Sequence, residues 1–172
     1  QVDSQGVIKF SKITNTVYYY PLVEAIRNFL KSPKVQIGQN LDQREIIKRG
    51  IEEFQKNFGD KQYKNGAIAK IAIYCPNIQV LEEEVYPFLT GDLKIPPGEI
   101  LKYHKGNKEF SQPEGSELEF RSLDLPFSNK RYILLVQVGK EGWDCRSLTG
   151  VILSQKGDSP KNMVLQTSCR CL

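Results

Sequence analysis

Hydrophobic and polar positions alternate with helical periodicity in three parts of this chain. Apolar residues recur at helical spacing over about 21–31, which begins with Pro21, and over about 42–58, which is followed by Gly59. Proline suits the first turn of a helix and glycine suits the position after its last turn, so both segments are predicted to be helices. A third helical pattern covers about 78–90.

Nearly continuous apolar runs lie between and after these helices and are typical of buried strands. The expected strands are 67–75, about 100–104, 132–138 and 150–154. Apolar strands that alternate with amphipathic helices indicate parallel pairing, with helices on both faces of the sheet. We therefore expect an open, mainly parallel α/β sheet over 61–172, preceded over 1–60 by a helical lead-in that packs on this core.

The composition is that of an ordinary globular protein. The 172 residues are 40% hydrophobic and 26% charged, which suits one compact domain. The net charge of +4 permits contact with nucleic acid, but surface lysine explains it more simply. No apolar run approaches the roughly 20 residues that cross a bilayer, and residues 1–9 have no secretion-signal pattern. We expect a cytoplasmic protein with no membrane partner.

The cysteines and the single histidine do not follow a metal-binding pattern. Cys169 and Cys171 are separated by one residue, whereas zinc sites commonly use pairs separated by two or more. His104 is the only histidine in the chain. Reduced thiols and no bound metal are therefore expected.

One loop after a predicted strand has residues suited to holding a ligand. Residues 139–144 read Gly-Lys-Glu-Gly-Trp-Asp and directly follow the 132–138 strand. In an open parallel sheet, ligands gather at the carboxyl ends of the strands. Gly142 would let the backbone approach a ligand, and Asp144 is an acceptor suited to ribose hydroxyls. The tripeptide alone is equally consistent with a packed Trp143 and a turn at Asp144.

A second candidate segment lies near the end of the sequence. Ser159 and Pro160 predict the start of a last helix, on which Gln166 and Arg170 are four residues apart and share one face. A glutamine and an arginine presented together can orient a water and neutralise charge on a transferring γ-phosphate. Taken alone, the segment is explained more simply by a solvated glutamine and a surface ion pair.

The order and spacing of these segments resemble the second motor domain of superfamily 2 helicases. The variant Glu-Gly-Trp-Asp over 141–144 is most similar to the Res subunit of Type III restriction–modification enzymes and its DEAD/DEAH-type relatives. Further segments similar to this family are 18–26, 31–33, 71–77 and 123–128.

The resemblance implies a three-layer, RecA-like fold of the P-loop NTPase type, in which ATP lies between two such domains. Glu141, Gly142 and Asp144 would face the nucleotide. Gln166 and Arg170 would reach across the cleft to the phosphates, with Arg170 as an arginine finger. The implied activity is that of an ATP-dependent DNA helicase or translocase, coupled to a restriction endonuclease.

The same resemblance implies contacts with the DNA backbone, which carry affinity without sequence information. Pro76, Asn77, Gly139 and Lys140 would lie along the DNA. His104 would lie near a DNA-facing segment, although an ordinary surface histidine is the simpler interpretation.

Some parts of the family's motor are absent from this sequence. It has no Gly-x-x-x-x-Gly-Lys-Ser/Thr loop and no Asp-Glu-x-His stretch. ATP with Mg²⁺ would therefore be held mainly by the first RecA-like domain, and this chain alone is expected to bind no nucleotide and to have negligible ATPase activity. The other implied partners are DNA and a modification methyltransferase subunit.

Three departures from the family weaken the detailed assignment. Cys169 stands where a glycine usually precedes the first arginine, and a second arginine would fall just past Leu172, so we expect the domain to be truncated there. Many relatives also have a larger apolar residue in place of Gly139. Two alternatives stay open, namely another DNA or RNA helicase and a noncatalytic α/β module that binds nucleic acid or protein.

Overall fold

The computed structural model describes residues 22–28, 38, 41–136 and 144–154. The chain divides into two compact units, residues 1–32 and 33–172. In the first unit, helix α1 (Leu22–Asn28) lies inside the range predicted for the first helix. The second unit contains the sheet, together with the other helices that are described below.

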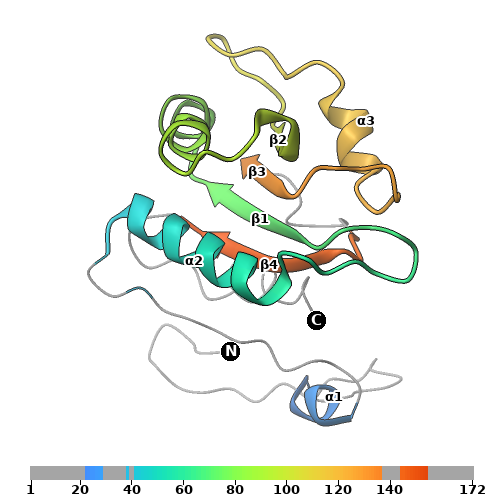
Figure 1. The fold of residues 1–172 in the computed structure, drawn as a ribbon. Coiled ribbons are helices and arrows are strands. Elements are labelled where there is room, and N and C mark those ends of the chain that lie inside the picture. Colours follow the sequence, from blue (N-terminus) through green and yellow to red (C-terminus); the bar gives the residue numbers. More distant parts are fainter. Residues whose placement is uncertain (1–21, 29–37, 39–40, 137–143, 155–172) are drawn as a thin grey trace, which may run out of the picture. The chain divides into compact units, whose positions relative to one another are not determined.

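The described strands form one parallel sheet. They are β1 (Lys70–Cys75), β2 (Ile100–Tyr103), β3 (Tyr132–Val136) and β4 (Leu148–Leu153). Their order is β2-β3-β1-β4, so β1 lies between β3 and β4, as Figure 1 shows. The predicted α/β class with a parallel sheet is confirmed.

Side chains alternate between two buried clusters on the two faces of the sheet. In β1, Ile71 and Ile73 belong to one cluster, whereas Ala72 and Tyr74 belong to the other. All six residues of β1 are buried. Burial on both faces explains why the central strands appear in the sequence as continuous apolar runs rather than as an alternating pattern.

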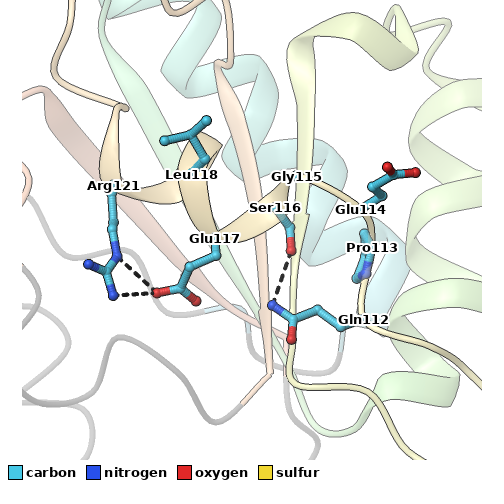
Figure 2. A pocket seen from close by; sticks show the side chains of 8 residues that line it. All are labelled: Gln112, Pro113, Glu114, Gly115, Ser116, Glu117, Leu118 and Arg121. Atoms are coloured by element: carbon cyan, nitrogen blue, oxygen red, sulfur yellow. Dashed lines mark hydrogen bonds and ion pairs between the residues drawn. The ribbon is translucent and has the colours of Figure 1, made fainter.

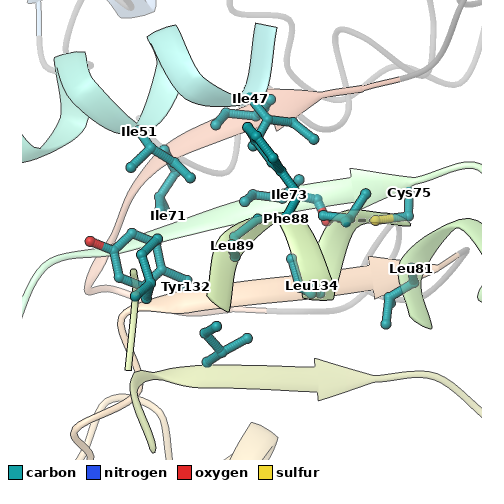
Figure 3. Packing of buried hydrophobic residues seen from close by; sticks show 14 of the residues in the cluster. Ile47, Ile51, Ile71, Ile73, Cys75, Leu81, Phe88, Leu89, Tyr132 and Leu134 are labelled. Carbon is teal, nitrogen blue, oxygen red and sulfur yellow. Dashed lines mark hydrogen bonds between the residues drawn. The ribbon is translucent and has the colours of Figure 1, made fainter. Parts of the chain in front are cut away.

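Helix α2 (Gln43–Phe58) covers one face of the sheet. It begins at Asp42, whose side chain accepts a hydrogen bond from the backbone N–H of Glu45 at 2.8 Å. Ile47 and Ile51 point from the helix toward β1 (Figure 3). The helix ends at Gly59 as predicted, but this glycine keeps right-handed helical angles, φ −53° and ψ −42°.

The predicted helix over about 78–90 is present, but it is wound more widely than an α-helix. Residues Val80–Val85 and Phe88–Asp92 are π-helical, and residues 86–87 join them in helical conformation. Pro87, which has no backbone N–H, lies between these two stretches. Leu81 and Leu89 are fully buried against the same sheet face that α2 covers. One 3-10 turn (Pro97–Glu99) then leads into β2.

Helix α3 (Ser116–Arg121) was not among the predicted helices. It contacts the second cluster through Phe120, whose ring stacks on Tyr103 with centroids 4.0 Å apart. Helices therefore contact both faces of the sheet. None of the described helices combines the length and the apolar character that a membrane crossing requires.

Candidate functional site

The connections of the sheet define a switch point between β1 and β3. After β1 the chain enters the 78–92 helix, whose Leu81 is buried on the α2 face. Cys145, in the turn before β4, and Leu148, the first residue of β4, are buried on the opposite face. The strand that follows β1 in the sequence, β2, lies beyond β3, and the strand that follows β3, β4, lies beyond β1, so the two neighbouring strands are continued in opposite directions across the sheet. In open α/β sheets, ligands bind in the crevice at the carboxyl ends of such a strand pair.

Two of the predicted DNA contacts lie at this switch point. Pro76 is half-buried and Asn77 is exposed, directly after β1. The side-chain oxygen of Asn77 accepts a hydrogen bond from the backbone N–H of Val80 at 2.8 Å, which caps the following helix. That oxygen is thus already occupied, and a phosphate would meet the amide NH₂ of Asn77 or the positive end of the helix.

The carboxyl end of β4 is tied to its neighbours by a chain of hydrogen bonds. Ser154 is buried, and its hydroxyl donates to the carbonyl oxygen of Tyr74 at 2.8 Å. Gln43, the first residue of α2, donates to the same hydroxyl at 3.1 Å. Neither Gln43 nor Ser154 could be recognised from the sequence as part of a site, because their contact joins residues 111 positions apart. Gln166 and Arg170, in the segment after Ser154, lie outside the described residues.

His104 is fully buried, so the expectation of a surface histidine is wrong. The backbone N–H of Gly106 donates to its Nδ1 at 3.1 Å, so Nδ1 is an acceptor and the proton is on Nε2. Nε2 in turn lies 3.0 Å from Oε1 of Glu82. The ring is therefore held between two protein groups. Its side chain has no surface for a DNA phosphate in this conformation.

Glu82 is partly buried, whereas its neighbours Glu83 and Glu84 are exposed. Its other carboxylate oxygen accepts from Lys102 Nζ at 2.7 Å. Burial acts to raise the pKa of Glu82, but the hydrogen bonds from Lys102 and His104 outweigh it, and the pKa lies below its ordinary value. The carboxylate thus joins the 78–92 helix to the edge strand β2.

Asp124 organises the turn that leads into β4. Its carboxylate accepts from the backbone N–H of Arg146 at 2.9 Å and from that of Ser147 at 2.8 Å, and from the Ser147 hydroxyl at 2.6 Å. The Cys145 thiol donates to it at 3.5 Å. Burial acts to raise the pKa of Asp124, but these bonds, those from Ser147 first, lower it overall.

Asp144, the predicted ribose acceptor, is exposed and directly precedes this turn. Ser147, three residues later, accepts a hydrogen bond from the backbone N–H of Lys70, the first residue of β1. Asp144 is therefore close in sequence to the amino ends of the strands, whereas Pro76 and Asn77 lie at the carboxyl ends. The other predicted residues of this loop, Gly139, Lys140, Glu141 and Gly142, lie outside the described residues.

Two further features of the described residues do not form a reactive centre. No three His, Cys, Asp or Glu side chains among them gather into a metal site. Burial raises the pKa of the Cys75 thiol to about 12 and that of the Cys145 thiol to about 11, so both stay protonated near neutral pH.

An open hollow lies at the start of α3, on residues 112–118 and Arg121 (Figure 2). In it, Glu117 accepts hydrogen bonds from Tyr103, Lys105 and Arg121, which lower the pKa of this carboxyl to about 2. The hollow is built from one local segment and is separate from the switch point. These bonds fix α3 to the end of β2.

In comparisons with protein families, curated proteins and solved structures, nothing matches this chain.

Proposed function

We propose that this chain is the second, RecA-like motor domain of an ATP-dependent DNA helicase or translocase of the Type III restriction kind. One observation carries the proposal, namely that β3, β1 and β4 are neighbours in a parallel sheet. The segments with candidate motor residues therefore follow adjacent strands: Pro76 and Asn77 follow β1, residues 139–143 follow β3, and the segment with Gln166 and Arg170 follows β4, whereas Asp144 directly precedes the turn into β4.

In this proposal the carboxyl edge of β1 and β3 faces the DNA backbone. Pro76, Asn77, Gly139 and Lys140 supply the contacts. The 78–92 helix begins at the same edge, and the partial positive charge at a helix N-terminus favours phosphate. Such contacts depend on charge and shape rather than on base sequence, which suits a motor that moves along DNA.

The nucleotide lies between this domain and a first RecA-like domain. Glu141, Gly142 and Asp144 face ATP, while Gln166 orients the attacking water and Arg170 neutralises the transition-state charge. ATP and Mg²⁺ are held mainly by the first domain, so the 172-residue chain alone has negligible ATPase activity. The other partners are DNA and a modification methyltransferase subunit. The protein acts in the cytoplasm.

The test is DNA-stimulated ATP hydrolysis by the full-length protein that contains both motor domains, with and without Arg170→Ala. Loss of a transition-state arginine is expected to reduce turnover on the order of 10³-fold or more while nucleotide binding is retained. Arg49→Ala is the matched control, because Arg49 is exposed on α2 and its described ion pair is a surface pair with Glu45.

The outcomes separate the competing functions. Unchanged turnover in Arg170→Ala would mean that the face of Gln166 and Arg170 is ordinary surface, and a noncatalytic α/β binding module would be the better account. Stimulation by RNA but not by DNA would favour the alternative of an RNA helicase.

A further inference from the structure

We propose that Asp124 is a positioning residue that fixes Asp144 through the turn 145–147, and thereby sets the affinity for the ribose of an adenine nucleotide. The inference rests on the proposed role of Asp144 in nucleotide binding. Asp124 itself does not touch the nucleotide. Its carboxylate acts on the backbone just after Asp144, which is the reason to treat the two aspartates as one unit.

Both oxygens of Asp124 are committed to this turn. Oδ1 accepts the backbone N–H of Ser147 at 2.8 Å and the Ser147 hydroxyl at 2.6 Å, and Oδ2 accepts the backbone N–H of Arg146 at 2.9 Å. Two consecutive backbone N–H groups thus point at the two oxygens of one carboxylate. Hydrogen bonds to an ionised acceptor are the stronger kind, so this fixes two peptide units directly after Cys145.

The opposite side of the turn is held as well. The carbonyl oxygen of Ser147 accepts from the backbone N–H of Lys70 at 2.9 Å. The carbonyl oxygen of Cys145 accepts from the backbone N–H of Leu148 at 3.1 Å. Asp124 is itself restrained, because Asn65 donates to its carbonyl oxygen at 3.0 Å. The turn is therefore held from both sides over residues 145–148. Asp144 is the first exposed residue beyond the pinned part.

Asparagine has the shape of aspartate but cannot make the same bonds. One of its two terminal atoms is an NH₂ group that only donates. In either orientation of the amide, this group would face the backbone N–H of Arg146 or that of Ser147. Asp124→Asn therefore leaves one peptide N–H without its acceptor. Ser147→Ala removes only the hydroxyl, with its contacts to Asp124 and to the Cys145 thiol, and keeps both backbone bonds.

The first experiment tests the anchor in the 172-residue chain, without nucleotide. Trp143 is the only tryptophan and is the residue before Asp144, so its emission and its quenching by acrylamide report on this part of the chain. We expect both to change in Asp124→Asn and to stay as in the wild type in Ser147→Ala. An unchanged signal in folded Asp124→Asn would overturn the inference.

A measurement on the wild type covers the possibility that Asp124→Asn does not fold. If the carboxylate holds the turn, the backbone amides of Arg146 and Ser147 exchange with solvent deuterium far more slowly than unprotected amides. Exchange of the two amides at the unprotected rate would contradict the anchor.

The second experiment links the anchor to the nucleotide in the full-length protein. Asp124→Asn is expected to raise the KM for ATP about tenfold with little change in kcat, since the hydrogen bond that a ribose hydroxyl donates to the Asp144 carboxylate is weakened. The KM for 2′,3′-dideoxy-ATP, which lacks both ribose hydroxyls, should not change. An equal rise for both nucleotides would reveal a merely structural role and overturn the inference.

One comparison keeps this inference distinct from the proposed function. If Asp144→Ala has no effect on the KM for ATP, the role of Asp144 in nucleotide binding is wrong. The coupling from Asp124 to ribose affinity then falls with it, even if the Trp143 signal still responds to Asp124→Asn. A change in the Trp143 signal together with the nucleotide-dependent KM effect supports both.

Discussion

Lys70 should make the folded chain more stable as the pH rises from 7 to 9.5. Its side chain is fully buried in the first position of β1, and its ammonium group donates to the carbonyl oxygen of Lys130 at 2.7 Å. Burial lowers its pKa from 10.5 to about 8, although the nearby Cys145 and Asp124 act to raise it. Folding therefore disfavours the charged form of this amine.

The sign and size of the effect follow from proton linkage. Between about pH 8 and pH 10.5 the unfolded chain holds a proton on Lys70 that the folded chain has released, so stability rises with pH across this window. From pH 7 to pH 9.5 this one group adds about 2 kcal/mol to the free energy of unfolding. The buried thiols of Cys75 and Cys145 act in the opposite direction, by about 1.5 kcal/mol together, because their raised pKa values keep them protonated only in the folded chain.

Comparing the wild type with a variant that lacks Lys70 separates the effect of this lysine on stability from that of the thiols. Urea unfolding of the wild type and of Lys70→Met, under reducing conditions at pH 7 and pH 9.5, gives the free-energy difference between the two proteins at each pH. Methionine has a similar unbranched shape and no charge. The contribution of Cys75 is common to both proteins and cancels, and so does most of that of Cys145, which interacts with Lys70 only as a secondary cause of its pKa shift. The stability of Lys70→Met relative to the wild type should therefore fall by about 2 kcal/mol on going to pH 9.5.

The control variant is Lys48→Met, since Lys48 is exposed and its only described ion pair, with Glu52, is a surface pair at 4.0 Å. Its free-energy difference from the wild type should be nearly independent of pH. The free-energy difference between Lys70→Met and the wild type is expected to change by about 2 kcal/mol between the two pH values. A change of less than about 0.5 kcal/mol would refute the reasoning.

Three further substitutions test the local geometry by urea unfolding. Gly106→Ala should lower the free energy of unfolding by about 2 kcal/mol or more, because φ is +77° and the new Cβ would lie 2.8 Å from the backbone nitrogen of Gln112; a loss below about 0.5 kcal/mol would contradict this. Asp42→Ala should cost about 1 kcal/mol through loss of the helix cap, and Asp42→Asn much less, so equal losses would argue against capping. Gly50→Ala should destabilise α2 although alanine favours helices, because the new Cβ would lie 2.6 Å from Cδ1 of Ile152. Adding Ile152→Val removes that atom and should recover part of the lost stability. A Gly50→Ala variant that is more stable than the wild type would disprove the clash.

The sheet was predictable because its strong signals are local. The runs that became β1, β3 and β4 are apolar on both faces, and residues 78–90, between β1 and β2, have helical spacing. Two details had no such signal. Helix α3 is only six residues long and leaves Leu118 exposed, so it shows no amphipathic period. The π-helical winding around Pro87 depends on backbone geometry that spacing alone does not reveal.

The environment of single charged residues was not predictable, because it depends on contacts between distant segments. His104 stands between Tyr103 and Lys105 in a basic stretch that is typical of a surface. It is buried because Glu82, 22 residues earlier, brings a carboxylate to its ring and shares that carboxylate with Lys102. Lys70 is buried for a similar reason, since its acceptor is a carbonyl oxygen 60 residues later.

The relation between Asp124 and Asp144 shows what the structure adds to a motif. In the sequence these are two separate observations, one before the 132–138 strand and one after it. The chain runs from Asp124 through β3 and returns to the start of β4, so the acceptor and the two N–H groups it holds meet at the amino end of β1. Two adjacent peptide groups need two acceptor atoms at a fixed separation, which a carboxylate supplies and an amide or a hydroxyl does not. The aspartate before β3 and the turn before β4 therefore have to be understood together, because the carboxylate of the first holds two backbone N–H groups of the second.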